Sequence, residues 1–331
     1  MRLLVLGGTR HVGRSIVEVA LSRGDQVTTL NRGLSRNPAP GVRALTADRT
    51  DPAALRDALA GGEWDAVVDT WSLAPRVVRD ACELLAGRVG HYGYVSSRSV
   101  HTDPIPPHAD EDFPVVDASA DSDGSDDYAA AKRGGELAAI GAFGPAALLA
   151  RPGVILGPYE ELGRMPWWIG RIERGGRVLA PGPADQPLQY IDARDLAIWM
   201  LSAADRGLGG AFNTVSRPGH TTMGELLETA VAVTGSDAQL VWATPGQIEQ
   251  AEISPWMEMP IWLPPDSEDI GLHHGDVSAA FAQGLTCRPV QETIADTWAW
   301  IQAEGYPVVR TDRPSLGLDP EKERKLLDQL G

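Results

Sequence analysis

The feature that most constrains the fold is an alternation of short apolar runs with amphipathic, helix-like stretches through the first third of the chain. Residues 2–6 form an apolar run that predicts a buried strand, residues 12–22 have the apolar spacing of a helix, and residues 26–30 predict the next strand. The pattern continues with helix, strand, helix and strand at 53–59, 66–69, 75–85 and 93–96. Strands that alternate with helices in this way predict a parallel sheet in an α/β fold.

The rest of the chain divides into a continuation of this pattern and a smaller unit. Residues 102–127 are proline-rich and then strongly acidic, which predicts a long surface loop with a solvated acidic run. We expect further helices at 127–140, 222–234, 290–304 and 319–330, strands at 146–150 and 211–215, a strand followed by a helix over 190–201, and a loop-rich insertion through 187. We predict one domain from 1–155 plus about 188–216, and a second lobe from 156–187 and 217–331.

Glycines cluster between the first strand and the first helix, in the run Leu6-Gly7-Gly8-Thr9-Arg10-His11-Val12-Gly13. The pyrophosphate of a dinucleotide requires glycine at this place, for a tight turn and for close approach to backbone N–H groups at a helix N-terminus. Arg10 replaces the central glycine of the usual pattern; its guanidinium either points toward a phosphate or lies in water. We therefore predict a Rossmann-type, doubly wound parallel sheet with a smaller C-terminal substrate lobe. The predicted dinucleotide contacts in this loop are Gly7, Gly8, Thr9, Arg10, His11, Val12 and Gly13.

The end of the second strand indicates which dinucleotide binds. An Asp or Glu normally stands there to accept hydrogen bonds from the ribose hydroxyls of NAD, but the chain reads Leu30-Asn31-Arg32-Gly33. The absent carboxylate and the guanidinium of Arg32 favour a 2′-phosphate, so we predict NADP(H), with Asn31 and Arg32 at the adenine ribose. Further on, Asp48 is suited to accept from the adenine amino group, and Asp51 in the same run is suited to cap a helix.

A tyrosine and a lysine stand four residues apart, Tyr128 and Lys132, at the start of a predicted helix, so their side chains share one face. Free tyrosine has a pKa of about 10 and is a poor acid at neutral pH. An ammonium group one turn away stabilises the phenolate and lowers that pKa. The chain has 29 basic residues, but only Lys132, Lys322 and Lys325 are lysine. A lysine retained here, four residues after a tyrosine, predicts a proton donor and the residue that tunes it.

Serines follow the strand at 93–96. A serine hydroxyl at such a strand end can orient a substrate carbonyl by a hydrogen bond. We assign this role to Ser97, while Ser96 and Ser99 remain alternatives. His101, His273 and His274 have no accompanying Cys or carboxylate at metal-ligand spacing, so we predict no metal site.

Together these residues resemble the extended short-chain dehydrogenase/reductase superfamily, also called NAD-dependent epimerases/dehydratases, from residue 1 to about 300. Aligning Ser97–His101 with the family's S-x-x-V-Y pattern puts the catalytic hydroxyl on Ser97, and Tyr128 and Lys132 fall on the family's Tyr and Lys. The loop is similar to a subgroup with G-G-T-R-F-x-G, which includes chloroplast stem-loop-binding proteins and bacterial reductase-like proteins. Further cofactor contacts are expected at Asp48, Arg49, Thr70, Trp71, Lys132, Pro152 and Val154.

Two departures from the family narrow the expected reaction. Sugar-nucleotide dehydratases of this superfamily carry Asp-Glu after the catalytic hydroxyl, whereas this chain has Arg98 and Ser99. Nucleotide-sugar epimerases have an asparagine that contacts the sugar where this chain has Val154. Dehydration is therefore disfavoured. The expectation of a nucleotide-sugar substrate is weaker, although this substrate class stays open.

Ten tryptophans are many for one chain, and several cluster with methionines near 165–168 and 256–262. In the resembled superfamily these insertions form the substrate pocket, where aromatic walls favour a ring or an apolar body; the alternative is that they build the core of the small lobe. The predicted substrate contacts are Trp71, Ser99, Met165, Trp167, Trp168, Trp256 and Trp262.

Charge and composition limit the partners. The 331 residues carry a formal net charge of -16, which disfavours nucleic acid and anionic membrane as partners. The first residues predict a strand and not a signal peptide, no apolar run approaches the roughly 18 residues that span a bilayer, and the two cysteines predict reduced thiols. We expect a cytoplasmic protein with a small-molecule substrate, and the resemblance implies a homodimer, since members of the superfamily are often dimers.

Three functions remain open from the sequence. The first is an NADP(H)-dependent reductase or dehydrogenase that interconverts a carbonyl and an alcohol on a small, ring-containing metabolite. The second is a sugar-nucleotide epimerase with tightly bound NAD. The third is a dinucleotide-binding RNA-binding or sensor protein without catalysis, which would have no need of Ser97, Tyr128 and Lys132.

Overall fold

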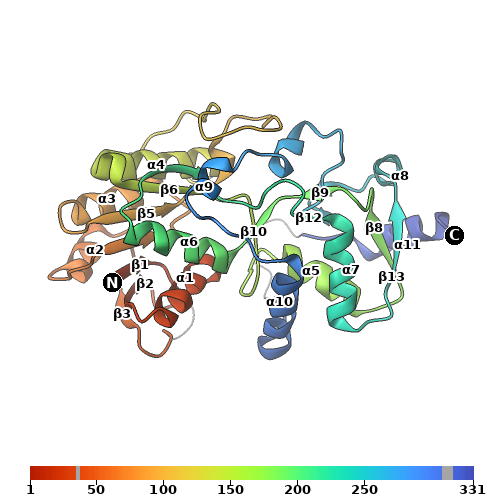
Figure 1. Ribbon diagram of the computed structural model, residues 1–331, viewed down its shortest axis with the longest axis horizontal. Coiled ribbons are helices and arrows are strands. Elements are labelled where there is room, and N and C mark those ends of the chain that lie inside the picture. The colour runs from red at the N-terminus through yellow and green to blue at the C-terminus, as the bar shows by residue number, and fades with distance from the viewer. Residues whose placement is uncertain (35–37, 308–315) are drawn as a thin grey trace.

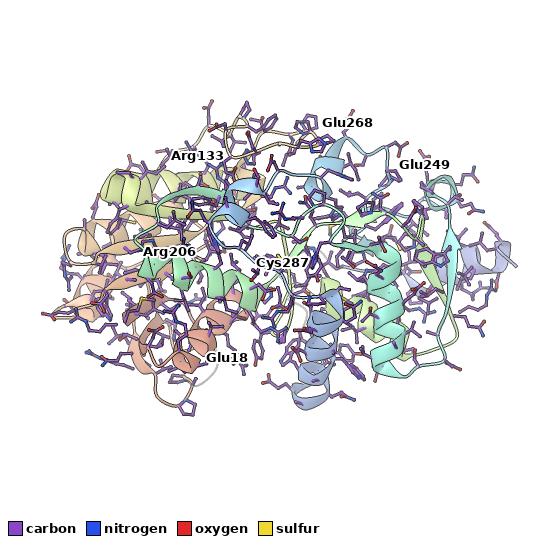
Figure 2. The ribbon with its side chains drawn as sticks, in the orientation of Figure 1. Glu18, Arg133, Arg206, Glu249, Glu268 and Cys287 are labelled. Atoms are coloured by element: carbon purple, nitrogen blue, oxygen red, sulfur yellow. The ribbon has the colours of Figure 1, made fainter. Side chains whose placement is uncertain are left out.

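The computed structural model describes residues 1–34, 38–307 and 316–331. Figure 1 shows two lobes side by side, a larger one built around a β-sheet with the N-terminus and a smaller one that contains helices α5, α7 and α10 and the C-terminus. Side chains fill the space between the ribbons of both lobes (Figure 2). Within the described residues, no helix is both long and apolar enough to cross a membrane.

The larger lobe is organised by a seven-stranded sheet of order β11-β6-β5-β4-β1-β2-β3, in which every neighbouring pair is parallel. Its strands are β1 (Arg2–Leu6), β2 (Gln26–Asn31), β3 (Arg43–Thr46), β4 (Ala66–Asp69), β5 (His91–Val95), β6 (Ala147–Arg151) and β11 (Gly210–Asn213). The strand order reverses between β1 and β4, and ligands of such sheets bind at the carboxyl ends of the strands beside this point. The predicted Rossmann-type sheet is confirmed.

Helices cover both faces of the sheet because its central strands are apolar on both sides. They are α1 (His11–Ser22) and α6 (Ala193–Asp205) on one face, and α2 (Pro52–Leu59), α3 (Pro75–Leu85) and α4 (Tyr128–Phe143) on the other. In β1, Leu3 and Val5 join the core beneath α1 and α6, whereas Leu4 and Leu6 join the core beneath α2 and α3. The alternation follows from the two-residue repeat of a strand.

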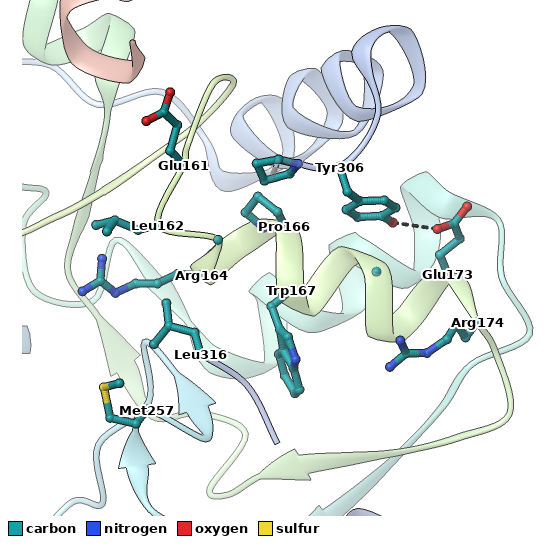
Figure 3. Close-up of a pocket in the computed structure, with 13 residues that line it drawn as sticks. Glu161, Leu162, Arg164, Pro166, Trp167, Glu173, Arg174, Met257, Tyr306 and Leu316 are labelled. Carbon is teal, nitrogen blue, oxygen red and sulfur yellow. Dashed lines mark hydrogen bonds between the residues drawn. The ribbon is translucent and has the colours of Figure 1, made fainter. Parts of the chain in front are cut away.

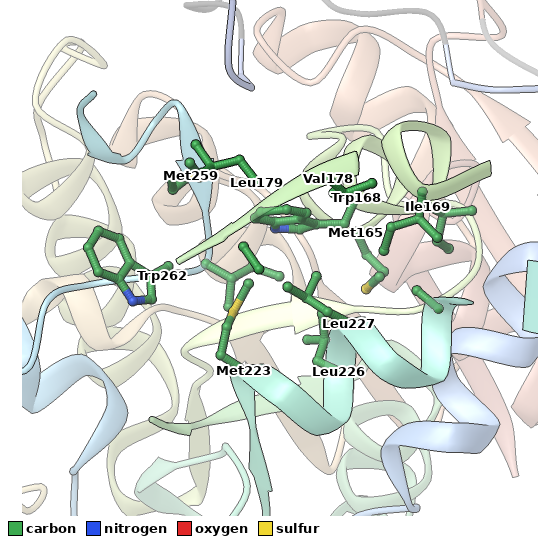
Figure 4. Close-up of a cluster of buried hydrophobic side chains, with 14 of the residues drawn as sticks. Met165, Trp168, Ile169, Val178, Leu179, Met223, Leu226, Leu227, Met259 and Trp262 are labelled. Carbon is green, nitrogen blue, oxygen red and sulfur yellow. The ribbon is translucent and has the colours of Figure 1, made fainter. Parts of the chain in front are cut away.

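The remaining elements are shorter strands and the helices of the smaller lobe. They are the 3₁₀ turns η1 (Arg98–Val100), η2 (Gly144–Ala146) and η3 (Glu268–His273); the strands β7 (Val154–Leu156), β8 (Arg177–Pro181), β9 (Pro187–Leu188), β10 (Tyr190–Asp192), β12 (Thr221–Thr222), β13 (Gln239–Ala243), β14 (Pro255–Trp256) and β15 (Met259–Pro260); and the helices α5 (Arg164–Glu173), α7 (Met223–Thr234), α8 (Pro245–Gln250), α9 (Ser278–Ala282), α10 (Val290–Glu304) and α11 (Pro320–Gln329). Helices α5, α7 and α10 pack around one apolar core, whose centre is drawn in Figure 4.

One prediction about secondary structure is wrong. The stretch through 187 was expected to be rich in loops, but it contains the ten-residue helix α5 and the strand β8. Met165, Trp168, Ile169 and Ile172 recur at helical spacing along α5 and are completely buried. The apolar side chains of this segment therefore form one face of a helix, which packs on the core of the smaller lobe.

The acidic loop before α4 is partly held by arginines. Arg79 of α3 bonds Asp80 and Asp121, and Arg76 bonds Asp123. The expected surface loop is present, but two of its carboxylates form ion pairs and are not free in solvent. Asp127 then caps α4 by accepting a hydrogen bond from Ala130 N at 3.0 Å, which makes Tyr128 the first residue of the helix.

Candidate functional site

The glycine loop lies at the carboxyl end of β1 and leads into α1. Gly7 and Gly8 have φ of +125° and +100°, a backbone region that side chains other than glycine rarely adopt. A Cβ on Gly13 would lie 2.7 Å from the backbone nitrogen of Gly8, so the loop can close on the helix only without one. Arg10 is the N-cap and makes no side-chain cap, which leaves the N–H groups of the first turn for an anion. This turn has the shape that a dinucleotide pyrophosphate requires.

A groove of about 410 Å³ runs over this loop. It is lined by the glycine loop, the ends of β2 and β4 and the first residue of α4: Leu6, Gly7, Gly8, Thr9, Arg10, His11, Val12, Gly13, Leu30, Asn31, Arg32, Leu34, Ala47, Arg49, Thr70, Trp71, Ser72, Leu73, Tyr128, Glu161 and Leu162. Most of the residues predicted to contact the cofactor are thus brought together. Pro152 and Val154 are not among the lining residues: Pro152 accepts a hydrogen bond from Arg98 N at 2.9 Å, and Val154 packs into the core of the smaller lobe.

Two side chains that line the groove, those of His11 and Arg49, do not offer it a free positive charge. Burial lowers the pKa of His11 to about 4, so this residue offers its backbone and not a cation. Arg49 is buried and donates from both terminal nitrogens to Asp69 at 2.7 Å each, so its charge is already paired. Arg49 therefore lines the groove as a cation that is already paired, and its contact with the cofactor stays a prediction.

Asn31 and Arg32, predicted to lie at the adenine ribose, both line the groove. Asn31 Oδ1 accepts a hydrogen bond from Gly33 N at 2.9 Å, and Arg32 is exposed. Asp48 accepts from both Thr50 N and Thr50 Oγ1, and these hydrogen bonds, with a smaller effect of the Arg32 charge, lower its pKa. Asp48 is not among the residues that line the groove. Asp51 caps α2, as the sequence allowed.

Lys132 is buried beside Trp71 and is not among the residues that line the groove. Its Nζ donates to the carbonyl oxygens of Val95, at 2.6 Å, and Trp71, at 2.8 Å, and lies 4.9 Å from the Tyr94 ring. Burial lowers the pKa of Lys132 to about 7, while the charges of Asp69 and Glu136 oppose this shift. Tyr128, one helical turn earlier, is 44% exposed and lines the groove. The pair thus has one buried member that can be charged and one accessible hydroxyl.

The serines after β5 separate into distinct roles. Ser96 Oγ donates to Glu136 at 2.7 Å, in a fully enclosed network, and is therefore unsuited to touch a substrate. Ser97 Oγ accepts from Ser99 N at 3.1 Å and lies 3.1 Å from Ser99 Oγ. Ser97 lies two residues after Val95, whose carbonyl oxygen accepts a hydrogen bond from Lys132 Nζ. Ser97 and Ser99 remain the predicted hydroxyls, but Ser97 is buried and neither residue is among those that line the groove.

Glu136 was not predicted from the sequence. It is completely buried, accepts from Arg151 Nε at 2.8 Å and from Arg133 at 2.9 Å, and these arginines with Ser96 keep its pKa low. It lies one turn beyond Lys132 on α4. The spacing of four residues between Lys132 and Glu136 was visible in the sequence. The partner of Glu136, Arg151, is on β6, and this contact could not be inferred without the fold.

A second cavity of about 560 Å³ adjoins the groove, because Glu161 and Leu162 line both. Figure 3 shows Trp167 and Met257 at the lower side of this cavity, and Tyr306, which donates to Glu173 at 2.6 Å, at the upper right. Trp167 is the predicted substrate contact that lines this cavity. Trp71 lines the dinucleotide groove, with its Nε1 donating to Ala74 O at 3.0 Å.

Three predicted substrate contacts are instead part of the core. Met165 and Trp168 are 0% exposed and Trp262 is 1% exposed, so a ligand cannot reach them without unpacking the lobe. Met165 and Trp168 lie on the buried face of α5, and Trp262 lies in the loop after β15; all three belong to the core of the smaller lobe. Trp256 is partly exposed, with the Arg164 guanidinium 5.4 Å from its ring, but it lines neither the groove nor the adjoining cavity. The aromatic cluster is therefore mainly structural.

The histidines have structural partners. His101 lies 3.1 Å from Phe113 O, and His273 bridges Gln189 N and Ile261 O while burial lowers its pKa to about 4. Across the part of the chain that the structure describes, no group of three or more His, Cys, Asp and Glu side chains is placed to hold a metal ion.

Comparisons with known proteins agree with this geometry. The model of the NAD dependent epimerase/dehydratase family matches residues 3–214. Bordetella bronchiseptica WbmH, solved in complex with NAD+, has a TM-score of 0.69 at 18% identity, over 92% of this chain and 99% of that one. Thermus thermophilus UDP-glucose 4-epimerase, solved in complex with NAD, has a TM-score of 0.63 at 20% identity, over 92% of this chain and 100% of that one.

A curated relative is the 41 kDa chloroplast stem-loop binding protein b of Arabidopsis thaliana, 26% identical over 218 residues, which are 61% of this chain and 54% of the relative. The chain thus matches about half the length of that relative. The family model covers residues 3–214, which include the glycine loop and the strands of the parallel sheet. This chain therefore belongs to the NAD dependent epimerase/dehydratase family.

Proposed function

We propose that the chain is an NADP(H)-dependent oxidoreductase that interconverts a carbonyl and an alcohol on a small, ring-containing metabolite. The observation that carries the proposal is the start of α4. There Tyr128 lines the dinucleotide groove and Lys132 is buried one turn later, with Nζ against the Val95 and Trp71 carbonyls. An accessible phenol one helical turn before a buried amine is suited to proton transfer where Tyr128 lines the groove.

In the proposed reaction, Tyr128, Ser97 and Lys132 each have a separate role. The nicotinamide would supply or accept a hydride at the carbonyl carbon. In the direction of reduction, the Tyr128 hydroxyl donates a proton to the carbonyl oxygen, so that a ketone or aldehyde becomes an alcohol. Ser97 orients that oxygen by a hydrogen bond. Lys132 stabilises the phenolate that remains on Tyr128, which then recovers its proton from water.

Arg32 supports NADP(H) as the cofactor. It is exposed at the adenine-ribose end of the groove, and residues 30–32 carry no carboxylate to repel a 2′-phosphate. One charge-assisted contact between Arg32 and the 2′-phosphate, weakened because solvent screens an exposed guanidinium, favours NADP+ over NAD+ by roughly tenfold. We expect Arg32→Ala to weaken NADP+ binding by about that factor and to leave NAD+ binding nearly unchanged, since NAD+ has no 2′-phosphate. Quenching of tryptophan fluorescence measures both dissociation constants.

Arg43→Ala is the matched control for Arg32→Ala, because Arg43 is an exposed arginine on the adjacent strand β3 and does not line the groove. Equal affinities for the two dinucleotides in the unchanged protein would argue for dual specificity. An Arg32→Ala protein that keeps its NADP+ affinity would remove Arg32 from the proposal.

The adjoining cavity supports the substrate class. Its wall is largely carbon, from Leu162, Pro166, Trp167 and Met257, and its volume is about 560 Å³. A ring of modest size can stack on the Trp167 indole there. The substrate is thus expected to be more apolar than a sugar diphosphate.

An epimerase with tightly bound NAD is the second candidate, favoured by the likeness to the Thermus thermophilus UDP-glucose 4-epimerase. A screen of ketones, aldehydes and their alcohols, followed at 340 nm, separates the two. An oxidoreductase consumes or forms NADPH in proportion to product, and Tyr128→Phe abolishes that signal. An epimerase releases bound NAD only on denaturation and changes no absorbance in turnover.

RNA binding is disfavoured as the main role. The net charge of -16 repels a phosphate backbone, and the curated stem-loop binding relative is matched over 54% of its length.

A further inference from the structure

Arg10 and Glu161 lie across the dinucleotide groove from each other. Arg10 belongs to the glycine loop, and Glu161 to the segment that leads from β7 into α5; both line the groove. Their side chains form an ion pair of 3.2 Å between Arg10 Nη1 and Glu161 Oε2. The pair therefore spans the place above the glycine loop where a pyrophosphate binds.

The segment that carries Glu161 is fixed on both sides of it. The Arg14 guanidinium of α1 lies 3.6 Å from the centre of the Tyr159 ring, and the Trp300 ring contacts the Tyr159 ring edge-on, with centroids 5.6 Å apart. Glu160 is completely buried and accepts from Arg164 N at 2.7 Å and Met165 N at 3.1 Å, which caps the start of α5. Glu161 is thus held over the groove by neighbours whose positions do not depend on Arg10.

We propose that Glu161 is a positioning residue that competes with the cofactor pyrophosphate for Arg10. Without cofactor, the carboxylate takes the place of a phosphate oxygen on the guanidinium. When the dinucleotide binds, the pyrophosphate replaces it and Arg10 turns from carboxylate to phosphate. The exchange is easy because both side chains are accessible, Arg10 at 50% and Glu161 at 35%, and exposed pairs of this kind are weak.

This inference rests on the dinucleotide groove, and it concerns the pyrophosphate that NAD+ and NADP+ share. It is therefore independent of which of the two is preferred and of whether net redox turnover occurs. It predicts that removal of the Glu161 charge tightens the binding of both dinucleotides, the opposite of what loss of a binding residue does.

The test measures dissociation constants of NAD+ and NADP+ for the full chain, for Glu161→Gln and for Glu63→Gln. Glu63 is the matched control, because its Oε2 forms an exposed ion pair of 2.8 Å with Arg2 Nη1 and it does not line the groove. We expect Glu161→Gln to tighten both dinucleotides roughly two- to fivefold, and Glu63→Gln to change them less than twofold. At about 1 M salt, where the Debye length is near 3 Å, the gain should shrink.

A double-mutant cycle separates competition from a structural effect. Because Glu161 engages Arg10 in the free protein, Arg10→Gln should weaken binding more in the Glu161→Gln protein than in the unchanged one. Unchanged or weaker binding of both dinucleotides to Glu161→Gln would overturn the inference and leave the proposed function intact. Failure of either dinucleotide to bind any of these proteins would overturn both.

Discussion

Replacement of Tyr128 by Phe is expected to lower turnover by roughly 10²–10⁴-fold while the affinity for NADP+ stays nearly unchanged. The change removes one hydroxyl, the proposed proton donor, and keeps the ring. Tyr128 is 44% exposed at the first position of α4, and the cap that starts this helix comes from Asp127, so the variant should fold normally.

The measurement is the steady-state rate on the substrate found by the screen, with the dissociation constant of NADP+ measured in parallel. A large loss of kcat with unchanged cofactor affinity supports a role in the chemical step. Near unchanged activity in the purified Phe variant would rule out Tyr128 as the proton donor. A loss of cofactor affinity equal to the loss of rate would assign it to binding alone.

Replacement of Trp168 by Ala is expected to lower the free energy of unfolding by about 3–5 kcal/mol. Trp168 is 0% exposed, its Nε1 donates to Pro260 O at 2.8 Å, and it packs among the side chains drawn in Figure 4. Removal of the ring leaves a cavity and an unpaired carbonyl, and both costs add.

Trp167→Ala is the matched control. The two indoles are in contact, with centroids 4.7 Å apart, but Trp167 lines the cavity and is only partly buried. We expect its replacement to cost at least about 2 kcal/mol less than that of Trp168, and to affect substrate affinity instead. Urea denaturation of both variants measures the difference. Equal losses of stability would contradict the assignment of Trp168 to the core and Trp167 to the cavity.

The sequence was sufficient for the parts of the molecule that depend on local pattern. The first strand, the glycine loop and α1 follow from apolar periodicity and from the conformations that Gly7 and Gly8 allow, and α3 and α10 begin and end where predicted. Tyr128 and Lys132 lie on one helix, so their spacing alone brought them together.

The parts that were missed depend on contacts between distant residues. The spacing of Met165, Trp168, Ile169 and Ile172 was helical, but the aromatic content of this segment suggested a pocket wall. Which tryptophan faces the core and which the cavity depends on how α5 rotates against α7 and α10. The pairing of Arg49 with Asp69 and of Arg10 with Glu161 likewise joins residues far apart in sequence. Without the fold, neither arginine could be assigned to its carboxylate partner.

A crystal structure of the chain with NADP+ shows where the dinucleotide binds and which residues contact it. We expect the pyrophosphate over Gly7–Gly13, the 2′-phosphate within reach of Arg32, and the nicotinamide ribose within hydrogen-bonding distance of Lys132 Nζ, with the Tyr128 hydroxyl facing the nicotinamide. A dinucleotide bound elsewhere would contradict the account. So would a nicotinamide directed away from α4, with Lys132 in contact only with the carbonyl oxygens of Trp71 and Val95.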